Sequence, residues 1–115
     1  MWISGAVRAY VCCQPVDFRN AIDGLAGLVG PLFDADPLSG HLFVFLSKDR
    51  TKVKILYWDR QGFALWYKRL ERGHFPRPQE LAARGLSLPE LSAWLEGIDI
   101  NRGRHLAPVV VSRVA

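Results

Sequence analysis

The sequence predicts a small α+β domain: an antiparallel β-meander packed against an N-terminal helix, followed by a short C-terminal helix. Apolar residues recur at helical spacing after Asp17. Three β-like runs separated by turn residues follow between residues 41 and 70. A capping-box pattern at Ser87 then predicts a second helix. A chain of 115 residues suits one domain, which we place at residues 1–100, with residues 101–115 as a tail of unassigned structure.

The N-terminal part contains a predicted strand and a predicted helix. Residues 6–13 are apolar, with β-branched and aromatic members, and Pro15 ends this strand. Asp17 is the expected N-cap of the helix. Pro31 disfavours continuation, so we expect the helix to end at residues 30–32. The residues at helical spacing are Phe18, Ile22, Leu25, Leu28, Val29 and Leu32.

A meander of three strands is predicted after the turn cluster at residues 36–40. Residues 41–46 are nearly all apolar, which is typical of a strand covered on both faces. Residues 52–58 alternate between the two faces of the sheet. A tight hairpin turn, in which Gly62 would take the positive φ, leads to the return strand at residues 63–70. On one face of the middle strand we expect Val53, Ile55 and Tyr57, and on the other face Lys52, Lys54, Leu56 and Trp58.

The C-terminal helix is predicted by its own sequence signals. Residues 71–84 are polar and contain prolines, so they indicate a loop or an extended edge. Glu90 stands at capping-box spacing from Ser87, and Pro89 suits a first helical turn. The helix therefore covers residues 88–95, with Gly97 ending it.

Composition argues against several classes of protein. No apolar stretch approaches the ~20 residues that a bilayer span requires, and the N-terminus lacks the pattern of a secretory signal. We therefore expect a cytoplasmic protein that does not contact membranes. The adjacent Cys12 and Cys13 are poorly placed to bond to each other, and the three histidines show no metal-ligand spacing. We expect neither a metal nor a cofactor.

Positive charge is concentrated in the meander and the loop after it. Residues 48–77 hold nine basic and three acidic side chains, 9 − 3 = +6, while the remaining residues hold six basic and eight acidic, 6 − 8 = −2. Such a surface attracts phosphates, and exposed aromatics can stack on unpaired bases. Alternatively, these lysines are solvent-exposed side chains that protect the edge of the sheet, and the aromatics are core residues. The candidate nucleic-acid-binding residues are Lys52, Lys54, Lys68, Arg69 and Arg72, and the aromatics are Tyr57, Trp58, Phe63, Trp66, Tyr67 and Phe75.

No catalytic residue is assigned. Metal-dependent nucleases and transposases gather carboxylates around divalent ions, but the candidate carboxylates here have ordinary structural roles, such as capping for Asp17 and a turn for Asp59. Phosphate-cradling and dinucleotide-binding glycine motifs are absent, as is a nucleophile elbow. We expect a protein that is not an enzyme.

Five short motifs stand in order along residues 15–100. They are Asp-Phe-Arg at 17–19 with Asp-Gly-Leu-Ala at 23–26, Asp-Pro-Leu-Ser-Gly-His-Leu-Phe-Val-Phe at 36–45, Lys-Val-Lys-Ile-Leu-Tyr-Trp-Asp at 52–59, Gly-Phe at 62–63 with Lys-Arg-Leu-Glu-Arg-Gly-His-Phe at 68–75, and Leu-Glu-Gly-Ile-Asp at 95–99. Together they resemble the TnpB-type accessory proteins of the insertion-sequence-66 family. The resemblance implies a small protein encoded beside the transposase of a mobile element and needed for efficient transposition. It also implies that the transposase, and not this protein, carries the strand-transfer chemistry.

Three hypotheses follow. The first is a non-catalytic transposition factor whose basic meander holds DNA at the element ends or docks an acidic surface of the transposase. The second is a pure protein adaptor that ignores DNA and uses exposed aromatics such as Tyr57 and Trp66 as its interface. The third, held last, is a metal-dependent nuclease.

Overall fold

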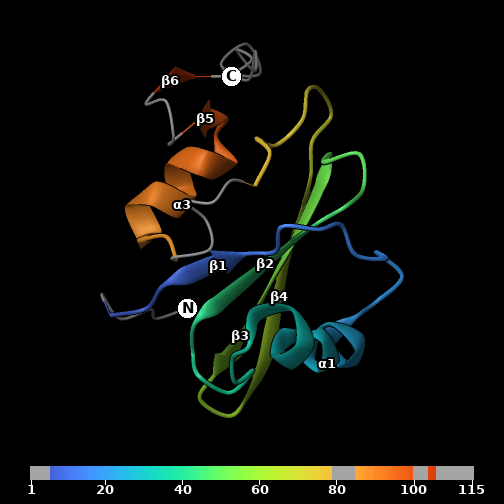
Figure 1. The fold of residues 1–115 in the computed structure, drawn as a ribbon, viewed down its shortest axis with the longest axis vertical. Helices are drawn as coiled ribbons and strands as arrows, with labels where there is room; N and C mark the ends of the chain where they lie inside the picture. Colours follow the sequence, from blue (N-terminus) through green and yellow to red (C-terminus); the bar gives the residue numbers. More distant parts are fainter. Residues whose placement is uncertain (1–5, 79–84, 100–103, 106–115) are drawn as a thin grey trace.

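A four-stranded sheet forms the centre of the molecule (Figure 1). The computed structural model describes residues 6–78, 85–99 and 104–105. Its architecture is α+β, which confirms the predicted fold class. The last three strands are antiparallel neighbours, as the predicted meander requires, whereas the first strand joins the edge in parallel to the second. In sheet order the strands are β1 (Ala9–Val11), β2 (Leu42–Leu46), β3 (Lys52–Asp59) and β4 (Gly62–Arg69).

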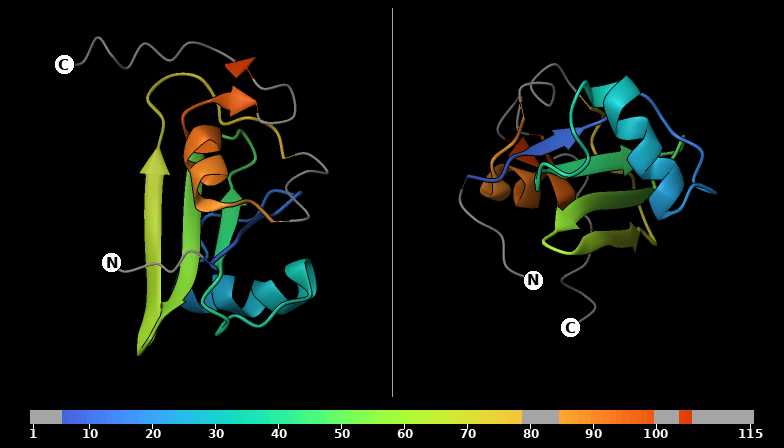
Figure 2. Two further views of the ribbon diagram at one scale, coloured as in Figure 1. Left: turned by 90° about the vertical axis from the view of Figure 1, so that its left-hand side faces the viewer. Right: turned by 90° about the horizontal axis from the view of Figure 1, so that it is seen from below.

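Two helices lie on opposite faces of this sheet (Figure 2). Helix α1 (Ile22–Phe33) connects β1 to β2, so these two strands can run parallel. Helix α3 (Leu88–Leu95) follows the loop after β4. A two-stranded ribbon of β5 (Ile98–Asp99) and β6 (Arg104–His105) comes last, so part of the segment after residue 100 pairs with the end of the expected domain.

Each face of the sheet has its own apolar cluster, because successive side chains of a strand point to opposite sides. On the α1 face, Leu25 and Val29 pack with Phe43, Phe45 and Leu56. The other face carries a second cluster, which includes Val44, Val53, Ile55, Leu91 and Trp94. Every residue of β2 is buried, which confirms the prediction of a strand covered on both sides.

The start of α1 differs from the sequence prediction. Its N-cap is Ala21, which makes no side-chain capping bond, and the expected cap Asp17 lies outside the helix. The carboxylate of Asp17 instead accepts hydrogen bonds from the main-chain N–H and the guanidinium of Arg19. Asn20 N–H also bonds the Asp17 carbonyl, at 3.1 Å, so this segment closes a separate turn before the helix begins.

Two backbone details also correct the sequence analysis. At the β3–β4 turn the positive φ of 60° falls on Arg60 and not on Gly62. Helix α1 continues past Pro31 to Phe33, because a proline in the last turn removes only one intrahelical hydrogen bond. Asp34 then ends the helix in the left-handed conformation, with its N–H bonded to the Gly30 carbonyl at 2.9 Å.

The start of α3 confirms the predicted capping box. The Ser87 hydroxyl accepts from Glu90 N–H at 3.2 Å, and the Glu90 carboxylate accepts from Ser87 N–H at 2.9 Å. Gly97, which follows the helix, has a φ of 90° that favours glycine.

Candidate nucleic-acid interface

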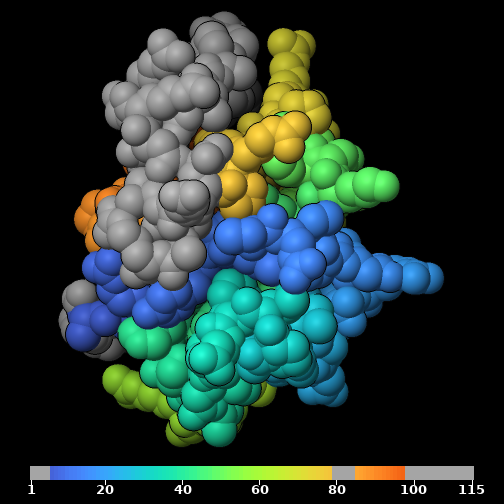
Figure 3. Space-filling model, in the orientation of Figure 1, coloured from blue at the N-terminus to red at the C-terminus, as the bar shows by residue number. Residues whose placement is uncertain are grey.

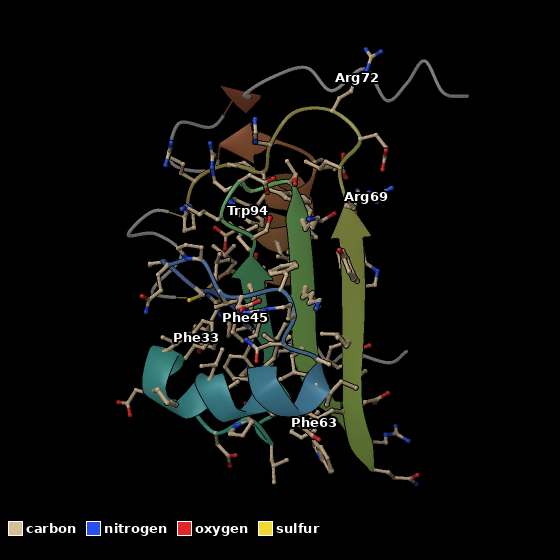
Figure 4. All side chains as sticks on the ribbon, turned by 90° about the vertical axis from the view of Figure 1, so that its right-hand side faces the viewer. Phe33, Phe45, Phe63, Arg69, Arg72 and Trp94 are labelled. Atoms are coloured by element: carbon tan, nitrogen blue, oxygen red, sulfur yellow. The ribbon has the colours of Figure 1, made fainter. Side chains whose placement is uncertain are left out.

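Basic side chains gather where β2 ends, β3 begins and β4 ends. We call this region the basic end of the sheet. Arg69 and Arg72 mark it in Figure 4, opposite Phe63 and α1. In Figure 3 the green β2–β3 turn and the yellow loop after β4 form neighbouring parts of the same surface. Its members are Lys48, Arg50, Lys52, Lys68, Arg69, Arg72 and Arg77.

Strand pairing holds the two chain segments of the basic end together. Lys52 and Arg69 are direct cross-strand partners, so their side chains project from the same face of the sheet. Lys68 projects from the opposite face. Arg69 forms an ion pair of 3.1 Å with Glu71, but both side chains are largely exposed, so the pair adds little stability. The guanidinium therefore remains accessible to an external anion.

The loop after β4 is anchored by one buried aromatic residue. Phe75 stacks on Trp94 of α3, with ring centroids 5.8 Å apart and planes 12° from parallel. Its N–H donates to the Arg50 carbonyl at 2.8 Å, and its carbonyl accepts from Arg50 Nη1 at 2.7 Å. These contacts fix the loop against the β2–β3 turn, and Arg72 and Arg77 are exposed side chains of this loop.

The β2–β3 turn is organised by Asp49. Its Oδ1 accepts hydrogen bonds from the hydroxyls of Ser47 and Thr51, each at 2.8 Å, and from Thr51 N–H at 3.1 Å. These bonds lower the pKa of the Asp49 carboxyl to about 2. Arg50, the next residue, takes a positive φ of 59°, and from this position its side chain reaches the Phe75 carbonyl.

Lys54 does not belong to this surface, which corrects the expectation that it contacts phosphate. Its side chain is only 7% exposed. The ammonium donates to the carbonyls of Phe18 and Asn20, and it lies 5.0 Å from the ring centroid of Phe18 and 5.4 Å from that of Tyr67. Alternation along β3 was predicted correctly, but the segment before α1 covers this position.

The aromatics named as stacking candidates divide into two groups. Phe75 is fully buried, and Trp58 packs edge-to-face on Phe63 at 5.1 Å, so these serve the core and the hairpin. Trp66 and Tyr67, in the outer strand β4, are 41% and 52% exposed. Of the six aromatics only these two are exposed, and Tyr57 is half-buried.

Sequence reasoning counted Lys48, Arg50 and Arg77 in the local charge but did not select them. Their selection depends on which turns meet at one end of the sheet, and linear spacing does not reveal this. His74 also lies here and donates from Nδ1 to the Asp49 carbonyl at 2.6 Å, because a carbonyl can only accept. The sequence did contain one signal for these residues. Phe75 follows His74, and a buried aromatic residue anchors the loop that carries the basic side chains.

Among residues 6–78, 85–99 and 104–105, no group of three or more His, Cys, Asp or Glu side chains is arranged to hold a metal ion. Cys12 is buried and Cys13 is exposed, and both are free. Burial raises the pKa of the Cys12 thiol. Over the same residues, no helix has the length and apolar character needed to cross a bilayer.

Comparison with known proteins identifies the family. The family described as IS66 Orf2 like protein matches residues 7–105, including the first five residues of the segment expected to be a tail. The chain is similar to two uncharacterized proteins of Sinorhizobium fredii (strain NBRC 101917 / NGR234). It is 40% identical to y4jC over 100 residues, covering 86% of each chain, and 37% identical to y4hO over 94 residues, covering 81% of this chain and 82% of the relative. No solved structure matches. The chain therefore belongs to the IS66 Orf2-like family, which indicates an accessory protein associated with transposition.

Proposed function

We propose that this protein is a non-catalytic, cytoplasmic accessory factor of insertion-sequence-66 transposition that binds DNA through the basic end of its sheet. The DNA would be that of the element ends, and the partner would be the transposase encoded by the same element. The catalytic carboxylates would then belong to the transposase. Family membership supports the link to transposition, and the charge distribution supports the contact with DNA.

The observation that carries the proposal is the convergence of the basic side chains at one end of the sheet. Lys52 and Arg69 meet across two strands, and Arg72 and Arg77 extend the surface along the loop that Phe75 anchors. Each side chain that neutralises a phosphate releases condensed counterions, which favours binding. The contact would be made to the DNA backbone, since such contacts position a protein without reading the sequence.

Binding of the full-length protein to a duplex of the element end tests this directly. Fluorescence anisotropy would be measured from about 50 to about 200 mM salt, where each phosphate contact contributes about 0.9 to the slope of log K against log[salt]. We expect a slope of several units. An unrelated duplex of equal length would show a similar slope if the contacts are to phosphate alone. No binding at the lowest salt concentration would exclude the DNA contact.

A second candidate function, the protein adaptor, is favoured by the exposed aromatics of β4. Within the described part of the chain β4 is an outer strand of the four-stranded sheet, and it presents Trp66 and Tyr67 to solvent. Exposed aromatic residues are common anchors of protein interfaces. Under this function, Trp66→Ala would abolish co-purification with the transposase, whereas Arg72→Gln would leave it unchanged. The opposite pattern, or no association with or without DNA, would contradict the adaptor role.

A further inference from the structure

A hollow of about 350 Å³ adjoins the basic end. Three segments form its walls: the chain that follows β1, the β2–β3 turn and the loop after β4. The volume lies at the lower end of the ~300–1,000 Å³ range of small-ligand sites. Hence there is room for a small polar group, and the lining side chains indicate which kind.

The lining is strongly basic. Lys48, Arg50 and Arg77 contribute three positive charges, and Asp49 is the single acidic residue among the side chains that line the hollow. The Asp49 carboxylate is already engaged by Ser47 and Thr51. The net charge of the lining is therefore positive even with His74 neutral.

Arg50 and Arg77 line the hollow from two different chain segments. Burial and the neighbouring Arg77 guanidinium lower the pKa of Arg50. In the described ranges neither guanidinium forms an ion pair with a carboxylate. Adjacent guanidinium groups without a counter-anion are stabilised when an anion binds between them.

His74 adds a polar atom on the same lining. Since Nδ1 donates to the Asp49 carbonyl, the ring orientation is fixed and Nε2 is the nitrogen left for a ligand. With Nδ1 donating, Nε2 donates to a phosphate oxygen only as part of an imidazolium ring. Arginine presents paired donors that match two oxygens of one phosphate.

We infer that this hollow binds a phosphate group between Arg50, His74 and Arg77. The inference rests on the proposed function for the source of that group, which would be a phosphate of the bound DNA. The shared chemistry is a tetrahedral oxyanion carrying at least one negative charge. The group comes either from the interior of a strand or from a 5′ end, and the arms of the experiment distinguish the two.

Inorganic phosphate is the first probe. The full-length protein, labelled with ¹⁵N, would be titrated with sodium phosphate at constant ionic strength, with sodium chloride as the reference. We expect saturable shifts of the His74 ring and the Arg50 and Arg77 side-chain signals. Arg77→Gln should weaken phosphate binding by about tenfold or more, the effect of losing one charge-assisted hydrogen bond. Arg77 is exposed, so this variant should remain folded.

Arg60→Asn is the control, because Arg60 is an exposed arginine that neither lines the hollow nor belongs to the basic end. It should leave the phosphate affinity within about twofold, since it removes only a distant charge. A second measurement follows alkylation of Cys13, an exposed thiol that lines the hollow. Phosphate should slow this reaction in the wild type but not in Arg77→Gln. Unsaturable shifts, or equal effects of the two arginine variants, would overturn the inference.

DNA arms identify the source of the phosphate. A duplex with 5′-phosphates would be compared with one with 5′-hydroxyls, each against wild type and Arg77→Gln. Equal weakening of both duplexes assigns an internal phosphate, and weakening of the phosphorylated duplex alone assigns a terminal one. Phosphate binding that depends on Arg77, without any DNA binding, would contradict the proposed function and leave the anion site standing. DNA binding without orthophosphate binding would contradict the anion site and leave the proposed function standing.

Discussion

The ammonium of Lys54 donates a hydrogen bond of 2.9 Å to the main-chain carbonyl of Phe18, which precedes α1. A second bond, of 2.8 Å, reaches the Asn20 carbonyl. One buried cation therefore satisfies two carbonyls of a segment that lies outside regular secondary structure. This lysine fastens the chain before α1 to the centre of the sheet.

Replacing this lysine should destabilise the fold without affecting DNA binding. Lys54→Met keeps most of the volume but leaves two carbonyls without their donor, at about 1–3 kcal/mol for each unsatisfied group. We expect a loss of about 2–6 kcal/mol in the free energy of unfolding, measured by urea denaturation. The control is Lys52→Met on the same strand face, which should change stability by less than about 0.5 kcal/mol. Comparable stability of the two variants would show that the buried bonds contribute nothing.

The Phe75 anchor should matter for both stability and binding. Phe75→Ala removes a fully buried ring stacked on Trp94, and such truncations cost about 3–5 kcal/mol. Because the ring holds the loop that carries Arg72 and Arg77, DNA affinity should fall even at temperatures where the variant is folded. Thermal unfolding and anisotropy would measure the two effects. Leu38→Ala, at an exposed site, is the control for stability. Unchanged DNA affinity of folded Phe75→Ala would contradict the positioning role.

Removal of charge at the two ends of the sheet should have unequal effects. Arg72 and Arg60 are both exposed, one at the basic end and the other at the β3–β4 turn. Arg72→Gln should lower the slope of log K against log[salt] by about 0.9, the contribution of one phosphate contact. Arg60→Asn, chosen because asparagine tolerates positive φ, should leave the slope unchanged. An equal decrease of the slope in both variants would mean that net charge, and not its position, controls binding.

Stability should depend on pH through Asp49. Hydrogen bonds lower its pKa from 3.8 to about 2, so the native state prefers the ionised carboxyl. Its stabilising contribution is fully present above about pH 4, and it is lost as pH falls through the folded-state value of about 2. The difference in melting temperature between wild type and Asp49→Ala should shrink over that range. Thr51→Val, which removes one donor, should reduce the difference at neutral pH. A difference that does not change with pH would contradict the assignment.

Much of the sheet was predictable because its signals are local. Alternation placed the side chains of residues 52–58 correctly on two faces, and the apolar run from 41 to 46 correctly indicated a doubly covered strand. The capping box at Ser87 was likewise confirmed. These patterns depend on neighbours within a few residues of each other.

What the sequence did not predict depends on contacts between distant segments. Parallel pairing of β1 with β2 joins residues more than thirty positions apart. The burial of Lys54 depends on the chain before α1, which no alternation pattern on β3 could reveal. Asp17 carried a capping signal, but its carboxylate was used by Arg19 in a local turn. The members of the basic end could be counted from the sequence, but their meeting point could not.

The separation of α1 from the basic end has a consequence for how a complex would be oriented. Around α1 and the β3–β4 turn, Asp23, Asp34, Asp36 and Asp59 are all exposed. A polyanion attracts one pole of such a molecule and repels the other, so the protein would dock on DNA with its long axis aligned and α1 directed away from the duplex. A second protein that joins this DNA complex would then contact the acidic surface around α1, which is directed away from the duplex.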